Sequence, residues 1–312
     1  MNQLRIIFLG TPDFAVASLD ALFTAGCNIV GVITAPDKPA GRGMKLNESA
    51  VKKYAVEKGL HVLQPEKLKN PEFLSTLKAL NADLQVVVAF RMLPELVWNM
   101  PPLGTINVHG SLLPQYRGAA PINWVIINGE KETGVTTFKL QHDIDTGDIL
   151  LQAKIIIEEN ETAGELHDRM KVIGAKVLVE TITGLIEKSL IEKPQASISL
   201  NDLRHAPKLF TETCSINWNN PCNQIHNLVR GLSPFPGAQT KLQDKVLKIY
   251  KSSKEVVIPS HAAGEWTTDS KSFLKFACAD GYVHVKELQL EGKKRMMIED
   301  FLRGFRAGII GN

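Results

Sequence analysis

The sequence lacks several features that would place it in a specialised class. Its 312 residues include only four cysteines: Cys27, Cys214, Cys222 and Cys278. Their spacing matches neither a zinc motif nor a redox motif. No apolar run reaches the length of a membrane span, and the short run near the N-terminus does not have the form of a secretory signal. We therefore expect a cytoplasmic protein with reduced thiols and no membrane partner.

Three common functional motifs are also missing. The first apolar run ends in a lone glycine, Gly10, without the G-x-G-x-x-G pattern of a dinucleotide site. Ser111 stands outside any G-x-S-x-G pattern, which argues against a serine hydrolase. Asp143, Asp145 and Asp148 have the odd spacing of a calcium loop, but no glutamate closes a twelve-residue loop. We therefore predict a site that needs no metal.

The length and composition indicate two globular domains. A chain of 312 residues is too long for one small core, and its contents of 44% hydrophobic and 22% charged residues are those of a soluble protein. Residues 190–207 contain two prolines and no sustained hydrophobic period. We predict that they form a linker between a front domain, residues 1–189, and a rear domain, residues 208–312. We expect a monomer, because no apolar seam is evident.

Charge is distributed unevenly between the two halves. Residues 204–312 contain 16 Lys and Arg against 10 Asp and Glu, whereas residues 1–203 contain 20 against 23. A basic rear half favours a polyanionic partner. Charge alone favours a solvated basic surface equally well.

The front domain has the pattern of an α/β fold. An apolar strand at residues 4–9, a helix at 11–25 and a strand at 28–34 form a βαβ unit, which requires a parallel pair of strands. Strands and helices continue to alternate up to the long amphipathic helix at 162–187. We predict a Rossmann-like, mostly parallel sheet with helices on both faces. Five short alternating runs between residues 238 and 290 predict a small OB-like β-barrel in the rear domain.

The most informative stretch lies at the end of a predicted strand, residues 105–109. Asn107 and His109 fall on the same face of this strand because side chains alternate. A lone histidine is usually a satisfied core residue, but His109 adjoins Gly110 at the edge of the sheet where ligands bind. A carboxylate-rich loop follows at residues 143–148. An amide, an imidazole and a carboxylate together suit acid–base chemistry at a carbonyl.

A second candidate feature is the loop at residues 35–46. It contains two prolines, two glycines and three cations, and it has no hydrophobic period. It follows a predicted strand at the carboxyl edge of the sheet. Arg42 stands between Gly41 and Gly43 on an arm suited to reaching a phosphate. The alternative is an ordinary surface loop.

Three runs of residues carry a family resemblance: 107–114 (NVHGSLLP), 117–122 (RGAAPI) and 143–149 (DIDTGDI). In this order they resemble the formyltransferases that use 10-formyltetrahydrofolate. The runs 10–14 (GTPDF) and 36–43 (PDKPAGRG) narrow the resemblance to the members that formylate initiator methionyl-tRNA. The resemblance extends over essentially the whole chain, including the linker and the rear barrel.

The resemblance implies a reaction and three catalytic residues. The methionyl α-amine would attack the formyl carbon of the folate co-substrate and form a tetrahedral intermediate with an oxyanion. Asn107 would donate a hydrogen bond to that oxygen. His109 would stabilise the same charge or move the amine proton, and which of these it does is left open. Asp145 would orient His109, stabilise its charged form or hold a water that relays the proton.

The resemblance also implies two sets of binding residues. The folate would contact ten residues of the front domain: Val88, Phe90, Arg91, Leu93, Ser111, Leu112, Leu113, Pro114, Asp143 and Ile144. The tRNA would contact four residues near the loop: Arg42, Lys38, Lys45 and Phe14. Residues 89–94 lack the usual Tyr-Gly of the family and are closer to the glycinamide ribonucleotide formyltransferase pattern. The basic barrel would contact the tRNA phosphates.

Two alternatives belong to other functional classes. The first is a folate-dependent enzyme that acts on a small-molecule amine. The second is a non-catalytic tRNA-binding protein on an inactive scaffold. The basic rear domain and Arg42 favour a tRNA substrate over a small amine, and the intact set of Asn107, His109 and Asp145 argues against an inactive scaffold.

Overall fold

The computed structural model describes residues 3–40, 45–195 and 203–305. The chain forms two compact units that interleave along the sequence. Unit 1 comprises Met1–Gly118, Thr133–Ile155 and His167–His205, and unit 2 comprises Ala119–Glu132, Ile156–Leu166 and Ala206–Asn312. The linear domain boundaries given above remain a prediction.

Unit 1 is built on a seven-stranded sheet in the order β5-β2-β1-β6-β7-β8-β9. Its strands are β1 (Arg5–Gly10), β2 (Asn28–Ile33), β5 (Val62–Leu63), β6 (Leu84–Val88), β7 (Thr105–His109), β8 (Glu132–Lys139) and β9 (Ile149–Ile156). All pairs from β5 to β7 are parallel, and β8 runs antiparallel to β7. The expected mostly parallel α/β fold is confirmed.

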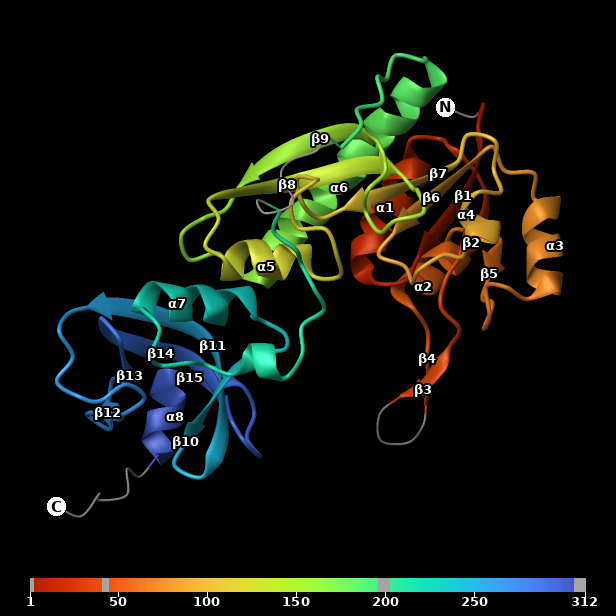
Figure 1. Cartoon of the computed structure of the whole chain (residues 1–312). Helices are drawn as coiled ribbons and strands as arrows, with labels where there is room; N and C mark the ends of the chain where they lie inside the picture. The colour runs from red at the N-terminus through yellow and green to blue at the C-terminus, as the bar shows by residue number, and fades with distance from the viewer. Residues whose placement is uncertain (1–2, 41–44, 196–202, 306–312) are drawn as a thin grey trace. The chain divides into compact units, whose positions relative to one another are not determined.

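Helices lie on both sides of this sheet (Figure 1). The unit contains α1 (Asp13–Thr24), α2 (Ala50–Glu57), α3 (Pro71–Ala79), α4 (Glu95–Trp98) and most of α6 (Ala163–Ile186). A Cβ added at Gly10 would lie 2.6 Å from that of Ala15 in α1, and one added at Gly174 in α6 would lie 3.3 Å from Val108. On the other face, Val87 packs with residues of α3 and α4, including Phe73 and Val97.

This packing determines where the residues of β7 point. Val108 faces α6, so Asn107 and His109 lie on the opposite face, which α3 and α4 cover elsewhere. In register, Asn107 pairs with Val87 on one side and Phe138 on the other. Strand β7 ends at His109, at the carboxyl edge of the parallel part of the sheet.

Unit 2 contains a curled antiparallel sheet in the order β10-β11-β14-β13-β12, with β15 paired to β14. Its strands are β10 (Ala238–Leu242), β11 (Lys245–Val256), β12 (Trp266–Thr268), β13 (Leu274–Cys278), β14 (Gly281–Leu290) and β15 (Met296–Met297). Its helices are α5 (Pro121–Ile127), α7 (Cys222–Gly231), α8 (Ile298–Gly304) and the short 3-10 helix η2 (Glu212–Cys214). The sheet is a half-barrel of the expected OB-like kind.

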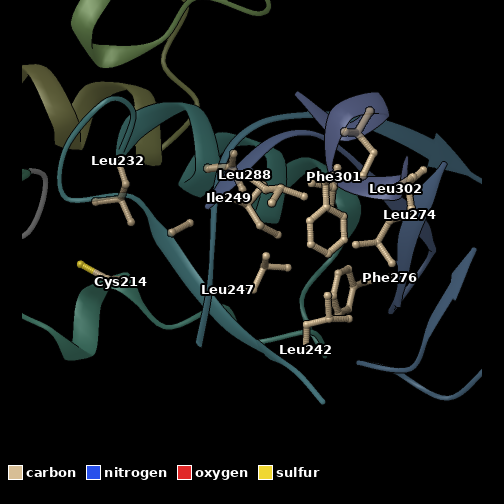
Figure 2. Close-up of a cluster of buried hydrophobic side chains, with 14 residues drawn as sticks. Cys214, Leu232, Leu242, Leu247, Ile249, Leu274, Phe276, Leu288, Phe301 and Leu302 are labelled. Carbon is tan, nitrogen blue, oxygen red and sulfur yellow. The ribbon is translucent and has the colours of Figure 1, made fainter. Parts of the chain in front are cut away.

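The core of unit 2 lies inside this curl. Leu247 and Ile249 of β11, Phe276 of β13 and Leu288 of β14 are fully buried, and Phe301 of α8 packs on them (Figure 2). Burying large apolar side chains stabilises the fold by roughly 1.5–3 kcal/mol each. Within the described part of the chain, every helix is too short or too polar to cross a membrane.

Helix α5 belongs to unit 2 although its sequence lies inside the predicted front domain. Its Asn123 donates a 2.8 Å hydrogen bond to the carbonyl of Gly231 at the end of α7. A Cβ added at Gly231 would lie only 2.6 Å from the Ile127 side chain, so the two helices approach closely. Trp124 donates to the carbonyl of Pro207 over 2.7 Å.

Candidate active site

One ring nitrogen of His109 is engaged in a hydrogen bond to the backbone. The side chain is 7% exposed at the end of β7, and its Nε2 lies 2.9 Å from the backbone carbonyl of Tyr116. A carbonyl oxygen only accepts hydrogen bonds, so Nε2 carries the hydrogen. The Phe138 ring meets the imidazole edge-on with centroids 6.4 Å apart. Only Nδ1 is therefore left to exchange a proton.

Asp145 stands beside that second nitrogen. Its Oδ2 lies 3.8 Å from His109 Nδ1, and its side chain is 13% exposed. The same oxygen accepts a 2.9 Å hydrogen bond from the backbone N–H of Gly118. A separation of 3.8 Å is too long for a direct hydrogen bond but suits an electrostatic pair or a bridging water.

The two residues beside the ring nitrogens of His109, Tyr116 and Asp145, both have a backbone in the left-handed region. Tyr116 has φ of 60° and Asp145 has φ of 55°. A non-glycine residue in this region costs about 1–3 kcal/mol and persists only where its surroundings hold it. Tyr116 is held by its N–H, which donates to the carbonyl of Arg204 over 2.6 Å. Strained residues of this kind are concentrated at functional sites.

Asn107 is the third of the predicted catalytic residues, with His109 and Asp145. It is half-buried and shares the β7 face with His109. Within the described residues its side-chain amide makes no hydrogen bond. An amide N–H that is positioned by a strand and still available is suited to an oxygen of a bound substrate.

The segment that follows β7 is fixed by its own hydrogen bonds. Ser111 is fully buried and donates to the Gln115 carbonyl over 2.6 Å. The Thr136 hydroxyl donates to the Ser111 carbonyl over 2.7 Å and accepts from the Leu113 N–H over 3.1 Å. The peptide between Leu113 and Pro114 is cis. Leu113 is buried, whereas Leu112 and Pro114 are half-buried.

The other predicted folate contacts lie after β6 and in the loop before β9. Val88 and Leu93 are buried and Phe90 is half-buried. Arg91 is exposed, and its guanidinium donates to the carbonyls of Pro65 and Glu66, the latter over 2.9 Å. Two predicted contacts in the later loop, Asp143 and Ile144, are exposed.

The predicted tRNA contacts are dispersed. Lys38 lies on β3 (Lys38–Ala40) and Lys45 on β4 (Lys45–Asn47), the two strands of a hairpin. Arg42 lies between them, outside the described residues. Phe14 is instead buried at 6% exposure on α1, with its ring centroid 5.2 Å from that of His167.

The base of this hairpin is anchored. Asp37 accepts hydrogen bonds from the Lys52 ammonium and from the Gln64 amide, the latter over 2.8 Å. The Lys52 hydrogen bond lowers the pKa of Asp37 below its ordinary value. Ser49 caps α2 by accepting from the Lys52 N–H over 3.0 Å. The hairpin therefore begins and ends at fixed points of unit 1.

One cluster in unit 2 has donor atoms of the kind that bind metals. The thiols of Cys222 and Cys278 and the Asp280 carboxylate lie within 4.8 Å of one another. The Asp280 carboxylate accepts a 2.7 Å hydrogen bond from the Cys222 N–H at the start of α7. Burial raises the pKa of the Cys222 thiol, which disfavours the thiolate that a metal needs. The cluster is therefore explained as packing and a helix cap.

Three residues around His109 were not predicted from the sequence. Tyr116 accepts from His109 through its carbonyl, Gln195 donates to the carbonyl of Asp145, and Arg117 donates to the Gln195 amide. The run 117–122 marked Arg117 as part of a motif without assigning it a role. Gln195 follows Pro194 in a stretch without hydrophobic period, and that pattern gave no signal.

Comparisons with known proteins match nearly the whole chain. A formyl transferase family model covers residues 4–182, and a formyl transferase C-terminal domain model covers residues 208–306. A methionyl-tRNA formyltransferase of Parabacteroides distasonis is 53% identical over 313 residues, 98% of this chain and 97% of the relative. One of Bacteroides fragilis is 51% identical over 310 residues, 97% of this chain and 96% of the relative.

The fold is also found among solved structures. WlaRD, a sugar 3N-formyl transferase crystallised in the presence of dTDP and 5-N-formyl-THF, matches with a TM-score of 0.68. The match covers 94% of this chain and 100% of that one at 20% sequence identity. At this identity the likeness shows a shared fold.

Proposed function

The chain belongs to the methionyl-tRNA formyltransferases of the formyl transferase family, and on that premise we propose how its site works. The site transfers the formyl group of 10-formyltetrahydrofolate to the α-amine of methionine on initiator tRNA. The products are N-formylmethionyl-tRNA and tetrahydrofolate. One observation carries the proposal. The Asp145 carboxylate lies 3.8 Å from His109 Nδ1, at the edge of the face that also presents Asn107.

His109 acts through Nδ1, because Nε2–H is committed to the Tyr116 carbonyl. The neutral α-amine attacks the formyl carbon, and a carbon–nitrogen bond forms. Nδ1 accepts the proton that this nitrogen must lose, and the Asp145 carboxylate stabilises the resulting imidazolium. When the bond to folate N10 breaks, the imidazolium returns the proton to N10.

Asn107 acts on the oxygen of the same intermediate. As the amine attacks, the formyl carbonyl oxygen becomes an oxyanion. The Asn107 amide donates a hydrogen bond to it, and a positioned donor of this kind contributes roughly 2.7–4 kcal/mol to transition-state stabilisation. Strand β7, which is paired with β6 on one side and β8 on the other, holds the amide, so little reorganisation is needed during the reaction.

The substrates occupy the surfaces around this centre. The folate lies against the segments 88–93 and 111–114 and the loop residues Asp143 and Ile144. The hairpin, with Lys38, Arg42 and Lys45, contacts the acceptor end of the tRNA. The half-barrel, with its excess of Lys and Arg, contacts the phosphate backbone. The enzyme acts in the cytoplasm as a monomer.

A direct assay tests the proposal. Purified full-length protein is incubated with 10-formyltetrahydrofolate and charged initiator Met-tRNA, and formylmethionine is measured after deacylation. Free methionine and glycinamide ribonucleotide serve as small-amine controls. We expect transfer to the tRNA-bound methionine alone. Transfer to a small amine without transfer to Met-tRNA would refute the assignment of the acceptor.

A further inference from the structure

The first part of the predicted linker, residues 192–195, is bonded to other segments of unit 1. Lys193 forms two backbone hydrogen bonds with Ile149, one in each direction, at 2.8 and 2.9 Å. The neighbouring Glu192 forms an ion pair with Lys139 at the end of β8. A stretch predicted to be linker therefore runs beside the first residue of β9, and this places Gln195 against the Asp145 loop.

Gln195 uses both ends of its amide there. Its Nε2 donates to the backbone carbonyls of Asp145 and Gly147, each over 2.8 Å. Its Oε1 accepts from Arg117, over 3.1 Å from Nε and 2.6 Å from Nη2. Because a guanidinium can only donate, Arg117 fixes which end of the amide faces the carbonyls.

These bonds close a ring around the carboxylate of Asp145. Arg117 donates to the Gln195 amide, and that amide donates to the backbone carbonyl of Asp145. The N–H of Gly118, the residue after Arg117, donates to the Asp145 carboxylate over 2.9 Å. Asp145 is in the left-handed region, with φ of 55°, and needs external support to stay there. At Gly147 an added Cβ would lie 1.6 Å from the Lys139 carbonyl, so the loop is pressed against β8 on its other side.

We propose that Gln195 is a positioning residue, which keeps the Asp145 carboxylate beside Nδ1 of His109 during formyl transfer. This rests on the function proposed above. Gln195 touches neither the reacting atoms nor His109. It acts by donating hydrogen bonds to the carbonyls of Asp145 and Gly147, which belong to one strained turn. A misplacement of about 1 Å in a catalytic group costs on the order of 100-fold in rate.

Two substitutions separate the bonds that Gln195 makes. Gln195→Met removes all of them with little change in volume. Gln195→Glu keeps the acceptor for Arg117 but sets a carboxylate against the carbonyls of Asp145 and Gly147. For both variants we expect kcat to fall by about 10- to 100-fold. We expect KM for Met-tRNA and for the folate to stay within about twofold of the wild-type values.

A matched control separates this role from general anchoring. Glu192→Gln weakens the ion pair with Lys139 in the same segment and leaves every bond of Gln195 in place. We expect its kcat to stay within about twofold of wild type, as is usual for an exposed ion pair. An equal loss of kcat in Glu192→Gln would show that the segment matters only as an anchor.

A double-mutant cycle tests whether Gln195 acts through Asp145. In an Asp145→Ala background, Gln195→Met should lower kcat by less than twofold further, because residues that act as one unit are non-additive. Full additivity would overturn the proposal, as would a wild-type kcat in Gln195→Glu. If the wild-type protein itself fails to formylate Met-tRNA, the proposed function fails instead, so the two failures are distinguishable.

Discussion

His109 and Asp145 are joined by a short electrostatic separation rather than a hydrogen bond. Nδ1 of the imidazole lies 3.8 Å from Oδ2 of the carboxylate, and that oxygen is already bonded to the Gly118 N–H. The other ring nitrogen is bonded to the Tyr116 carbonyl. Nδ1 is therefore the ring nitrogen that can accept a proton, and the carboxylate is near enough to stabilise the resulting positive charge.

Replacing the charge of Asp145 while keeping its shape tests this relationship. Asp145→Asn retains an oxygen that accepts from Gly118 but removes the negative charge beside the imidazolium. We expect kcat for formyl transfer to fall by about 10²-fold or more, with tRNA affinity nearly unchanged. Steady-state kinetics and a filter-binding titration with uncharged initiator tRNA measure the two quantities. A variant with wild-type kcat would exclude a role for the charge.

Substitution of Asn107 tests the oxyanion contact. Asn107→Ala removes the amide donor without disturbing the backbone pairs of β7 with Val87 and Phe138. We expect kcat to fall by about 10²- to 10³-fold, because the lost hydrogen bond is strongest in the transition state. Binding of tRNA should be nearly intact. Loss of tRNA binding with little change in kcat would contradict the assigned role.

Local patterns predicted much of unit 1. The continuous apolar residues of β6 mark a strand covered on both faces, and alternation along β7 placed Asn107 and His109 together. The glycines, prolines and cations at residues 35–46 predicted a loop, and the described parts of that loop form the β3–β4 hairpin. In each case the signal and the structure that it predicts lie within one short stretch of chain.

Contacts between distant residues could not be predicted in this way. Arg117 and Gln195 are 78 positions apart, and Asn123 and Gly231 are 108 apart. Neither pair has a sequence period or a spacing rule that relates its members. Gln195 was assigned to a linker because its neighbours are polar, yet hydrogen bonds to backbone carbonyls need no apolar pattern. The sequence likewise has no local pattern that relates α5 to the other segments of unit 2.

Removal of the Arg42 guanidinium tests the hairpin. Arg42→Ala should raise KM for Met-tRNA by about tenfold and leave KM for the folate unchanged, because a phosphate contact would be lost. The slope of log affinity against log salt should fall by about one unit. Lys78→Ala, at an exposed position on α3, is the control and should change neither quantity. Wild-type tRNA kinetics in Arg42→Ala would refute the hypothesis that the hairpin binds tRNA.

His226 of α7 makes the stability of unit 2 depend on pH. It is 3% exposed, its Nδ1 lies 3.0 Å from the Ser252 hydroxyl, and its Nε2 has no hydrogen-bond partner among the described residues. Burial, assisted by the charges of Arg230 and Lys254, lowers the pKa of His226 to about 4 from 6.5. The folded protein therefore resists a proton that the unfolded chain accepts.

The direction of the effect follows from proton linkage. Between pH 6.5 and 4 the unfolded chain binds more protons at His226 than the folded chain, so stability falls as pH falls through this range. The loss at the lower end is about 3 kcal/mol from this group. Urea unfolding of the full chain at pH 7.5 and 4.5 should show it. In His226→Gln, where an amide replaces the titrating ring, the drop should be smaller by about 2 kcal/mol. The exposed His61→Gln should keep the wild-type drop. Equal losses in wild type and His226→Gln would assign the acid sensitivity to other groups.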